Sequence, residues 1–563
     1  MSARSRLRPR GWLVAVALCA AAGGCQTPGP NDTADSFGLD FSMPPGAAVS
    51  GAIVFFVDGV NAAIFQRMLE ANELPAAKSY FADRGMYCPR AVASIPTVTL
   101  ANETSFVTGR FPGHHGIVHN LWFDRSKWLF RNYKTIAQKN TLDGDYSAPN
   151  LYEQFPNAPT YSVFFQPHRG ATFIENCAPG GIVFFFGWYM YLDRMNLNEL
   201  RNVAAMARQQ RAWPAVTVVY QLAPDFEGYR SGVSSPQYRQ SLLHTDRQIG
   251  RVLGDLKRAG LLEKLTLVLL SDHGLTDVRN HFELEEFLRN HAGLDVGTRL
   301  SDERTPLARR QRALRRHTAV LVVAGDRFAA LYLRRTVRKD GRPVGLAPWP
   351  DRPTAEDFRS YPFGKDGQID LLDLMAGQEA VDAVAYRAGP GRVRVRRAGG
   401  EVEFRQEAGP RELVNYRLLA GDDPLGYRGS VPADALAGRP LSPRQWLEAT
   451  DDTDFPDLPA QVLAYFRHER AGDLALFAAP GWDFKNKNLA GHGGIRAVDM
   501  HVPILIAGPG VPHGRIDAAR SVDVMPTLLR LLGRPLPPGL DGQPLLGTGR
   551  RSLSPPRPAQ RGR

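Results

Sequence analysis

Carboxylates and imidazoles stand at the ends of several apolar runs in this sequence. Asp58, Asp225 and the adjacent pair Asp272 and His273 each come where such a run ends, and a further histidine, His492, lies late in the chain among glycines. Two ligands of this kind on consecutive residues after a strand suit a zinc-type site. The residues therefore predict a metal site. Two simpler interpretations stay open: Asp58 as a helix cap and His492 as a hydrogen-bonding loop residue.

The segment that follows the first of these strand ends carries the most specific pattern in the chain. Its fixed positions are Pro96-Thr97-x-Thr99-x-x-Asn102, then Thr108-Gly109, Pro112 and His115-Gly116-Ile117. This pattern resembles the nucleotide pyrophosphatase/phosphodiesterase branch of the alkaline phosphatase superfamily. Order and spacing agree at several separate places in the chain, which argues against chance agreement on an unrelated fold.

The resemblance implies a role for two residues of this segment. Thr99 would be the nucleophile, and Asn102 would help to hold the phosphoryl oxygens. The chemistry agrees, because a threonine hydroxyl is a poor nucleophile at neutral pH until a metal or a base activates it. At a helix N-terminus, Thr99 also meets backbone donors that favour a phosphate. Asn102, three residues on, shares its helix face.

The resemblance also sorts the strand-end residues into two metal sites. The ligands of the metal that binds the nucleophile are matched by Asp58, Asp272 and His273. Two ligands of the other metal are matched by Asp225 and His492. The resemblance thus implies two divalent metal ions, Zn²⁺ by preference, held about 4 Å apart as in two-metal sites for in-line displacement. It also implies a covalent phospho-threonine intermediate.

One position departs from the family pattern. The family has Asp-x-x-Gly-His, whereas this chain has Asp225-Phe-Glu-Gly-Tyr229, so a tyrosine stands where a histidine ligand is expected. Tyr229 is an atypical metal ligand, because a phenol with a pKa of about 10 gives up its proton reluctantly. Glu227 and His244 are the alternative donors nearby. The sequence therefore leaves two outcomes, an altered second metal site or a weakened one.

Together these residues predict a metal-dependent phosphoester hydrolase that acts on small-molecule phosphodiesters or nucleotide pyrophosphates. The preference for a diester rests on Asn102, rather than an arginine, beside the nucleophile. Hydrolysis of a phosphonate or a phosphomonoester within the same superfamily is one alternative. A surface-anchored binding lipoprotein that keeps the fold with weakened catalysis is another. The aromatic stretch 184–191 either lines a substrate pocket or forms buried core followed by a turn.

The elements that must position these residues alternate between apolar strands and helices. Continuous apolar runs, typical of buried parallel strands with an active site at their carboxyl ends, occupy 51–57, 214–222, 265–271 and 502–507. Helical patterns lie between them, at 61–72, 238–259 and 522–532. This alternation predicts an α/β fold. The resemblance specifies it as an alkaline-phosphatase-like α/β/α sandwich with a central, mostly parallel sheet.

Residues 286–470 do not follow this alternation, and their short β-type runs predict an inserted α+β cap with some antiparallel structure. We therefore expect the catalytic core in two parts, 50–285 and 471–549, around the inserted cap. An arginine-rich stretch at 304–316 is interpreted as a solvated helix face, with anion binding as the alternative.

The N-terminus is typical of an export signal. A basic start precedes an apolar stretch too short to span a bilayer comfortably, and small residues then lead to Cys25. Residues 1–25 resemble a bacterial lipoprotein signal, in which Cys25 becomes lipidated, and an ordinary cleaved signal peptide is the alternative. A Pro- and Gly-rich tether follows at 26–49. Both interpretations predict export, to the periplasm or a lipid anchor in the outer membrane, or otherwise secretion.

The net charge of +12 does not indicate a nucleic-acid-binding protein. Four arginines of the signal and five of the basic tail, 550–563, account for most of it and leave +3 for the body of the chain. We expect no specific nucleic-acid partner and a disordered tail. In the body, Cys88 and Cys177 either pair in an oxidising compartment or remain two buried thiols.

Overall fold

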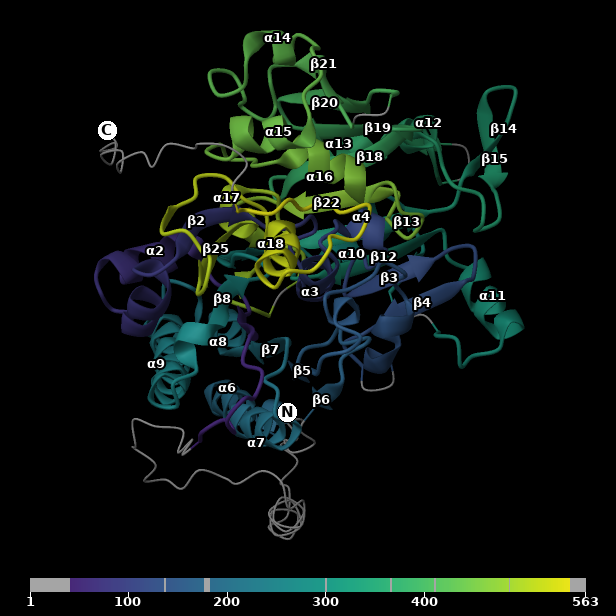
Figure 1. Ribbon diagram of the computed structural model, residues 1–563. Helices are drawn as coiled ribbons and strands as arrows, with labels where there is room; N and C mark the ends of the chain where they lie inside the picture. Colours follow the sequence, from purple (N-terminus) through teal and green to yellow (C-terminus); the bar gives the residue numbers. More distant parts are fainter. Residues whose placement is uncertain are drawn as a thin grey trace.

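The computed structural model describes residues 41–135, 138–176, 183–298, 301–364, 367–409, 412–485 and 487–546. The predicted signal with Cys25, residues 26–40 of the tether, Cys177 and the basic tail lie outside the described residues. None of the described helices is long and apolar enough to cross a membrane. Two large β-sheets organise the described chain, the second of them towards the top of Figure 1.

The first sheet has eight strands and contains the apolar runs found in the sequence. Its strands, in spatial order, are β26 (Gly514–Arg515), β2 (Met86–Val92), β25 (His501–Ala507), β8 (Leu265–Ser271), β1 (Gly51–Val57), β7 (Val216–Gln221), β5 (Thr160–Val163) and β6 (Phe173–Glu175). β1 lies between β7 and β8 and is parallel to both. β25 is antiparallel to both of its neighbours, β8 and β2. The sheet is therefore mixed and mostly parallel.

Helices cover both faces of this sheet, because alternate side chains of each strand point to opposite faces. Ile53 and Phe55 pack on one face with the helices α2 (Ala62–Glu70), α7 (Leu200–Gln210) and α9 (Pro236–Arg258). Val54 and Phe56 pack on the other face with the helices α3 (Thr99–Thr108), α6 (Tyr189–Asn198) and α18 (Val524–Leu531). The predicted α/β/α sandwich is confirmed. Cys88 in β2 is a buried free thiol, and burial raises its pKa to about 12.

The register of the three central strands places their carboxyl ends side by side. Val57, the last residue of β1, pairs with Gln221 of β7 and with Ser271 of β8. The residues that follow these strands therefore begin at the same edge of the sheet, which is where α/β folds carry their sites.

The second sheet is also eight-stranded and belongs to the part that the sequence sets apart as an inserted cap. Its strands, in spatial order, are β11 (Val296–Gly297), β12 (Ala319–Ala324), β13 (Phe328–Leu333), β22 (Leu474–Ala478), β18 (Val381–Gly389), β19 (Arg392–Arg397), β20 (Gly400–Gln406) and β21 (Val414–Gly421). All of its pairings are antiparallel except that of β11 with β12. Because β22 pairs with β13 and β18, the cap extends beyond the expected boundary at residue 470.

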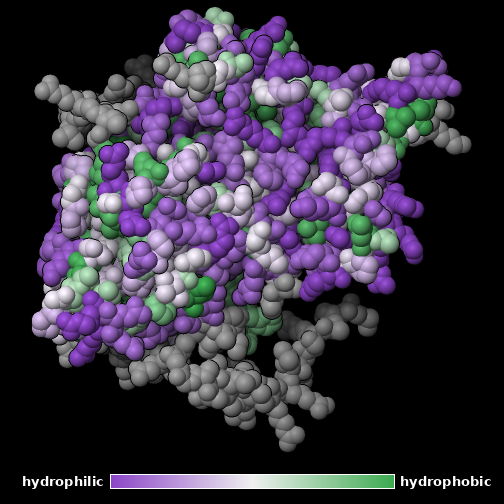
Figure 2. All heavy atoms as spheres, turned by 45° about the vertical axis from the view of Figure 1, so that its right-hand side comes forward, coloured by the Kyte–Doolittle hydropathy of each residue, from purple (hydrophilic) through white to green (hydrophobic). Residues whose placement is uncertain are grey.

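Both faces of the second sheet are covered as well. One face packs against α10 (Leu284–His291), α12 (Ala355–Arg359) and α13 (Leu371–Ala376). The other packs against α15 (Pro443–Thr450), α16 (Leu458–Tyr465) and the hairpin of β3 (Leu121–Asp124) and β4 (Leu129–Asn132). Hydrophilic residues dominate the face seen in Figure 2, with apolar residues in small groups. In α11 (Leu307–Arg315) only Leu314 is fully buried, in agreement with a solvated helix face.

Candidate metal centre

The imidazole of His273 is the meeting point of the first group of side chains. Its Nε2 atom lies 3.3 Å from Asp58 Oδ1, 3.1 Å from Asp272 Oδ2 and 3.2 Å from Thr99 Oγ1. Asp58 follows β1, the pair Asp272 and His273 follows β8, and Thr99 is the first residue of α3. Four side chains from three separate segments of the sequence therefore converge on one point. Their ligand atoms form a donor set of three oxygens and one nitrogen.

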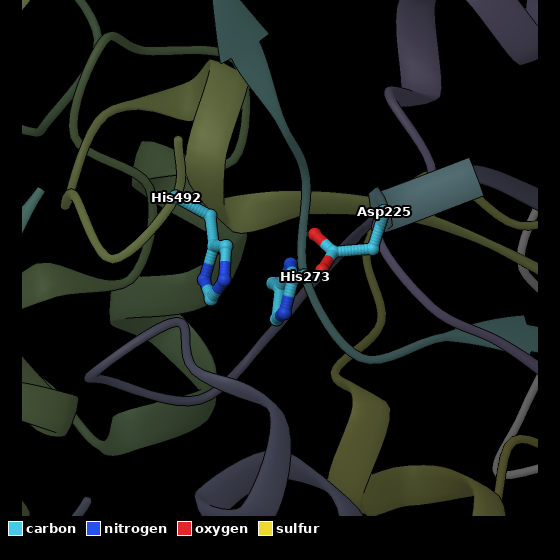
Figure 3. A group of neighbouring side chains, drawn as sticks. All are labelled: Asp225, His273 and His492. Carbon is cyan, nitrogen blue, oxygen red and sulfur yellow. The ribbon is translucent and has the colours of Figure 1, made fainter. Parts of the chain in front are cut away.

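A second group shares His273 with the first. Ligand atoms of Asp225, His273 and His492 all lie within 4.8 Å of one another, and all three residues are buried. The carboxylate of Asp225 points towards His273, and the imidazole of His492 approaches it from the other side (Figure 3). The two imidazole rings are stacked, with their centroids 3.6 Å apart. The structure thus brings together all six residues that the sequence predicts as metal ligands.

Both imidazoles are held in the orientation that a metal ligand requires. His273 Nδ1 lies 3.1 Å from the carbonyl oxygen of Gly274, and His492 Nδ1 lies 2.6 Å from that of Thr97. A carbonyl oxygen only accepts, so Nδ1 carries the proton in each ring and Nε2 presents its lone pair to the centre. Burial lowers the pKa of His273 to about 3 and that of His492 well below its usual value, which keeps both rings neutral.

Each carboxylate of the centre has one buried oxygen without a hydrogen-bond partner among the described residues. Asp58 Oδ1, Asp225 Oδ1 and Asp272 Oδ2 are buried and have no hydrogen-bond partner within the described chain. Burial raises the pKa of all three, and the mutual proximity of Asp58 and Asp272 adds to the effect for Asp58. Buried anionic oxygens of this kind are stable when they are paired or bind a cation. The residues therefore fit a divalent metal centre of the nitrogen and oxygen type.

Two contacts position Asp225 at the start of α8 (Ala223–Ser231). The buried carboxylate of Asp193, from α6, accepts hydrogen bonds from the backbone N–H groups of Leu222 (2.7 Å) and Ala223 (3.0 Å) and so caps this helix. Gly59 has a φ of +68°, and a Cβ atom there would lie 2.7 Å from the Cβ of Asp225. A larger residue at position 59 would therefore displace Asp225 from the centre.

Thr99 is partly buried in the N-terminal turn of α3, where backbone N–H groups have no partner within the helix. The N–H of Leu100 donates a hydrogen bond to Asn120 Oδ1 at 2.9 Å. Within the described residues Asn120 Nδ2 makes no hydrogen bond, so this amide group is available near the start of α3, where Leu100 follows Thr99. Asn120 stands in the same motif segment as Thr99, but the spacing of that segment does not single it out.

Asn102 has a different role from the one predicted. Its Oδ1 accepts from the N–H of Ser94 at 2.7 Å, and its Nδ2 donates to the carbonyl oxygens of Ser94, Pro96 and Val98 at 3.0–3.2 Å. The side chain is 1% exposed. The expectation that Asn102 holds phosphoryl oxygens is therefore corrected: it shares a helix with Thr99, but its amide faces back into the loop that precedes α3 and fixes that loop.

Tyr229 lies beside the second group. Its ring centroid is 5.8 Å from that of His492. Burial, and then the Asp225 carboxylate, raise the pKa of its phenol well above the usual value of about 10. The two alternative donors are not at the centre: His244 Nε2 bonds to the Met190 carbonyl at 2.9 Å, and neither His244 nor Glu227 belongs to a ligand group. Tyr229 is the remaining candidate for the position of the expected histidine.

The cap also positions a ligand, which the sequence could not reveal. The turn between β12 and β13 contacts the loop of His492: the His492 N–H donates to Gly325 O at 2.7 Å, and the Arg327 N–H donates to His492 O at 3.1 Å. Between them, Asp326 adopts a φ of +64° and pairs with Lys485 at 3.0 Å. His492 is thus held in place by the second sheet.

Aromatic side chains extend from Tyr229 to the surface. Tyr229 contacts Phe226, with ring centroids 6.2 Å apart, and Phe226 stacks on Tyr189 at 4.4 Å and meets Phe184 edge-on at 5.1 Å. Beyond Phe184 the aromatic side chains are exposed, including Phe185, Phe186 and Trp188. The interpretation of the stretch 184–191 as buried core is therefore wrong for its first half, which forms an accessible aromatic wall next to the second ligand group.

About half of the chain is similar to known proteins of one family. A family model described as type I phosphodiesterase/nucleotide pyrophosphatase matches residues 52–340. The venom phosphodiesterase of Macrovipera lebetinus is 25% identical over 247 residues, which cover 42% of this chain and 27% of that protein. Mouse ectonucleotide pyrophosphatase/phosphodiesterase family member 1 is 26% identical over 237 residues, 42% of this chain and 24% of that protein. The matched part spans about a quarter of the length of these two curated relatives.

Solved structures share the fold over most of the chain. Murine ectonucleotide pyrophosphatase/phosphodiesterase 5 has a TM-score of 0.51 and 16% identity, and the match covers 87% of this chain and 96% of the murine one. The human counterpart has a TM-score of 0.52 and 15% identity over 88% of this chain. Another structure of the murine protein is of an inactive variant in complex with AMP.

Proposed function

The chain belongs to the type I phosphodiesterase/nucleotide pyrophosphatase family, and from this premise we propose that it is a metal-dependent hydrolase of phosphodiesters or nucleotide pyrophosphates with Thr99 as its nucleophile. The observation that carries the proposal is the position of the Thr99 hydroxyl. It lies at the first residue of α3, 3.2 Å from the nitrogen on which Asp58 and Asp272 also converge.

The residues divide between two cation sites. Asp58, Asp272, His273 and Thr99 would hold one divalent ion. Asp225 and His492 would hold the other, with Tyr229 as the atypical third ligand. Zn²⁺ is the ion that this mixture of imidazole and carboxylate ligands suits best. When bound, two such ions supply positive charge that favours the ionised hydroxyl and the departing oxygen.

The protein's own groups account for the remaining chemistry. The Thr99 hydroxyl gives its proton to solvent water and forms a bond to phosphorus, while the bond from phosphorus to the leaving oxygen breaks. The product is a phosphoryl ester of Thr99, which water hydrolyses to restore the hydroxyl. The N-terminal N–H groups of α3 and the Asn120 amide would donate to the phosphoryl oxygens. This assignment replaces Asn102.

The aromatic side chains beside the second ligand group support a substrate with an organic substituent on its phosphoryl group. Phe226 and Tyr229 connect this ligand group to the aromatic wall, and a flat ring could stack on Phe226. A nucleoside or aryl diester fits this chemistry better than inorganic pyrophosphate does. The relatives of this chain include a venom phosphodiesterase and an ectonucleotide pyrophosphatase/phosphodiesterase. These relatives support the proposal that the chain acts outside the cytoplasm, with Cys25 as the proposed site of lipid attachment.

A test combines metal analysis with hydrolysis of bis(4-nitrophenyl) phosphate. We expect about two zinc ions per chain, chelator-sensitive turnover, and a Thr99→Ala variant that keeps its metals but loses turnover. Thr135→Ala, a change at an exposed threonine, serves as the matched control with full activity. Full activity of Thr99→Ala would refute the assignment of the nucleophile.

The position of Tyr229 favours one alternative, a binding lipoprotein with an incomplete second site. One metal ion per chain and no turnover of any phosphodiester, phosphomonoester or phosphonate would support that alternative. Turnover of phosphonates in preference to diesters would instead assign the chain to the other hydrolase class predicted from the sequence.

A further inference from the structure

A small cavity in the cap is lined by two arginines that form no ion pair with a carboxylate of the described residues. Its volume is about 180 Å³, and it lies between the end of β18, the segment that leads into α12 and the residue before β22. Its charged side chains are Arg352, Arg387 and Asp473. The residues of the metal centre do not line it.

The only carboxylate in the cavity wall is already paired. Asp473 Oδ2 accepts hydrogen bonds from the guanidinium of Arg125 and from the N–H of Leu333 (2.8 Å), and the side chains of Arg125 and Asp473 are 6% and 1% exposed. This pair is neutral as a unit. Arg352 and Arg387 form no ion pair with any described carboxylate, so the cavity carries two uncompensated positive charges in a poorly solvated place.

Each of the two arginines is anchored by one nitrogen and leaves another unused. Arg352 Nη2 donates to the carbonyl oxygen of Glu469 at 2.6 Å, while its Nη1 is buried without a partner. Arg387 Nη2 donates to the carbonyl oxygens of Phe466 and His468. Its Nη1 makes no hydrogen bond within the described residues. The backbone segment 466–469 therefore fixes both guanidinium groups and leaves N–H donors free at each of them.

The electrostatics of the surroundings agree with a missing anion. Burial, and then the neighbouring Arg352, lower the pKa of Arg387 to about 10. Burial also lowers the pKa of Arg352; Arg125 adds to this, while Asp473 and Glu469 oppose it. His468, on the same segment, stays neutral because burial and Arg470 lower its pKa to about 4. Two guanidinium groups that repel each other in a buried place would be stabilised by a bound anion.

We infer that this cavity binds a small oxyanion of the phosphate class between Arg352 and Arg387. Guanidinium groups recognise tetrahedral oxyanions through paired, charge-assisted hydrogen bonds. The volume is below the ~300–1,000 Å³ of pockets that hold drug-sized ligands. It therefore suits free phosphate or sulfate and excludes a nucleotide. The site is independent of the proposed catalytic reaction.

Equilibrium dialysis with inorganic phosphate tests this inference on the metal-loaded chain. Phosphate bound at the proposed metal centre would be identified as the binding lost on addition of a chelator. We expect one further phosphate per chain that is insensitive to the chelator and is displaced by sulfate but not by chloride. Absence of this second phosphate at millimolar concentration would mean that the cavity holds water alone, and it would overturn the inference.

Variants locate the second phosphate. Arg352→Gln and Arg387→Gln should each weaken its binding about tenfold or more, the equivalent of one charge-assisted hydrogen bond. Phosphate binding at the metal centre should stay intact, which also reports correct folding. Arg335→Gln, at an exposed arginine that pairs with Asp351, is the matched control and should bind both phosphates normally.

A variant with the opposite expected effect on phosphate affinity complements the arginine variants, with metal content as the measure of correct folding. Asp473→Asn removes the one carboxylate of the cavity wall while keeping its size, and it should tighten the binding of the second phosphate. Weaker binding in this variant, with the metal centre still loaded, would contradict the inference. So would equal binding in all four variants.

Discussion

Replacement of Tyr229 by histidine tests the second metal site with a calculable effect. A phenol must lose its proton to bind a metal ion well, and at pH 7, three units below a pKa of ~10, this costs about 4 kcal/mol. Burial and the Asp225 carboxylate raise the pKa further, so this figure is a lower bound. A histidine with a pKa near 6.5 is already neutral at pH 7. Tyr229→His should therefore tighten binding of the second ion by about a thousandfold or more.

Competition with a coloured zinc chelator, measured from pH 6.5 to pH 9, gives the affinity of each site. In the wild type, the affinity of the second site should rise about tenfold per pH unit, because each unit deprotonates ten times more phenol. In Tyr229→His it should be nearly constant above pH 7. Tyr229→Phe keeps the ring, lacks the oxygen and should bind the second ion more weakly than the wild type. Equal, pH-independent affinity in all three proteins would refute Tyr229 as a ligand.

The remaining predictions address the groups around Thr99 and Asp225. Asn102→Ala should lower the free energy of unfolding in urea by about 3 kcal/mol, because buried groups of the loop before α3 lose their partners. Asn120→Ala should lower kcat and cost only about 1 kcal/mol of stability, because one backbone donor, that of Leu100, loses its partner. The reverse pattern would restore the catalytic role of Asn102. Gly59→Ala should lose the second metal ion and cost about 1–3 kcal/mol, because its φ of +68° and the contact with Asp225 are both incompatible with a Cβ atom; retention of two ions in metal analysis would contradict this. Phe226→Ala should raise KM about fivefold for aryl and nucleoside diesters and leave KM for methyl esters unchanged, because only the former lose stacking; equal effects on both would exclude the aromatic wall from substrate binding.

The convergence of the candidate metal ligands could be predicted from the sequence because continuous apolar runs and their ends have a direct structural meaning. A continuous apolar run that ends in an aspartate places that aspartate at the edge of the sheet, and the register of Val57 with Gln221 and Ser271 then aligns the ends of three such runs. The amino-acid composition of a strand does not indicate whether it runs parallel or antiparallel to its neighbours. The apolar run 502–507 therefore resembles the parallel strands in sequence, although the strand that contains it, β25, is antiparallel to both of its neighbours.

The hydrogen-bond partners of Asn102 and Asn120 could not be predicted from their spacing in the sequence. Helical spacing puts Asn102 on the same side of α3 as Thr99, but the loop before the helix folds back and captures its amide. Asn120 contacts the same helix from the end of the same segment, 20 residues after Leu100, and helical spacing does not predict a contact between residues that far apart. The contacts of His492 with the turn around Asp326, and the pairing of Arg125 with Asp473, depend on how the cap packs, which periodicity does not encode.

The central claim, that Thr99 is the nucleophile, is tested most directly by trapping the covalent intermediate. The metal-loaded protein is mixed with bis(4-nitrophenyl) phosphate, quenched with acid during turnover and digested, and the peptides are analysed by mass spectrometry. We predict a phosphoryl adduct on Thr99 in the wild type and none in Thr99→Ala, with both proteins carrying the same metal content. An adduct on another residue, or rapid turnover with no adduct at any quench time and full activity in Thr99→Ala, would contradict the account.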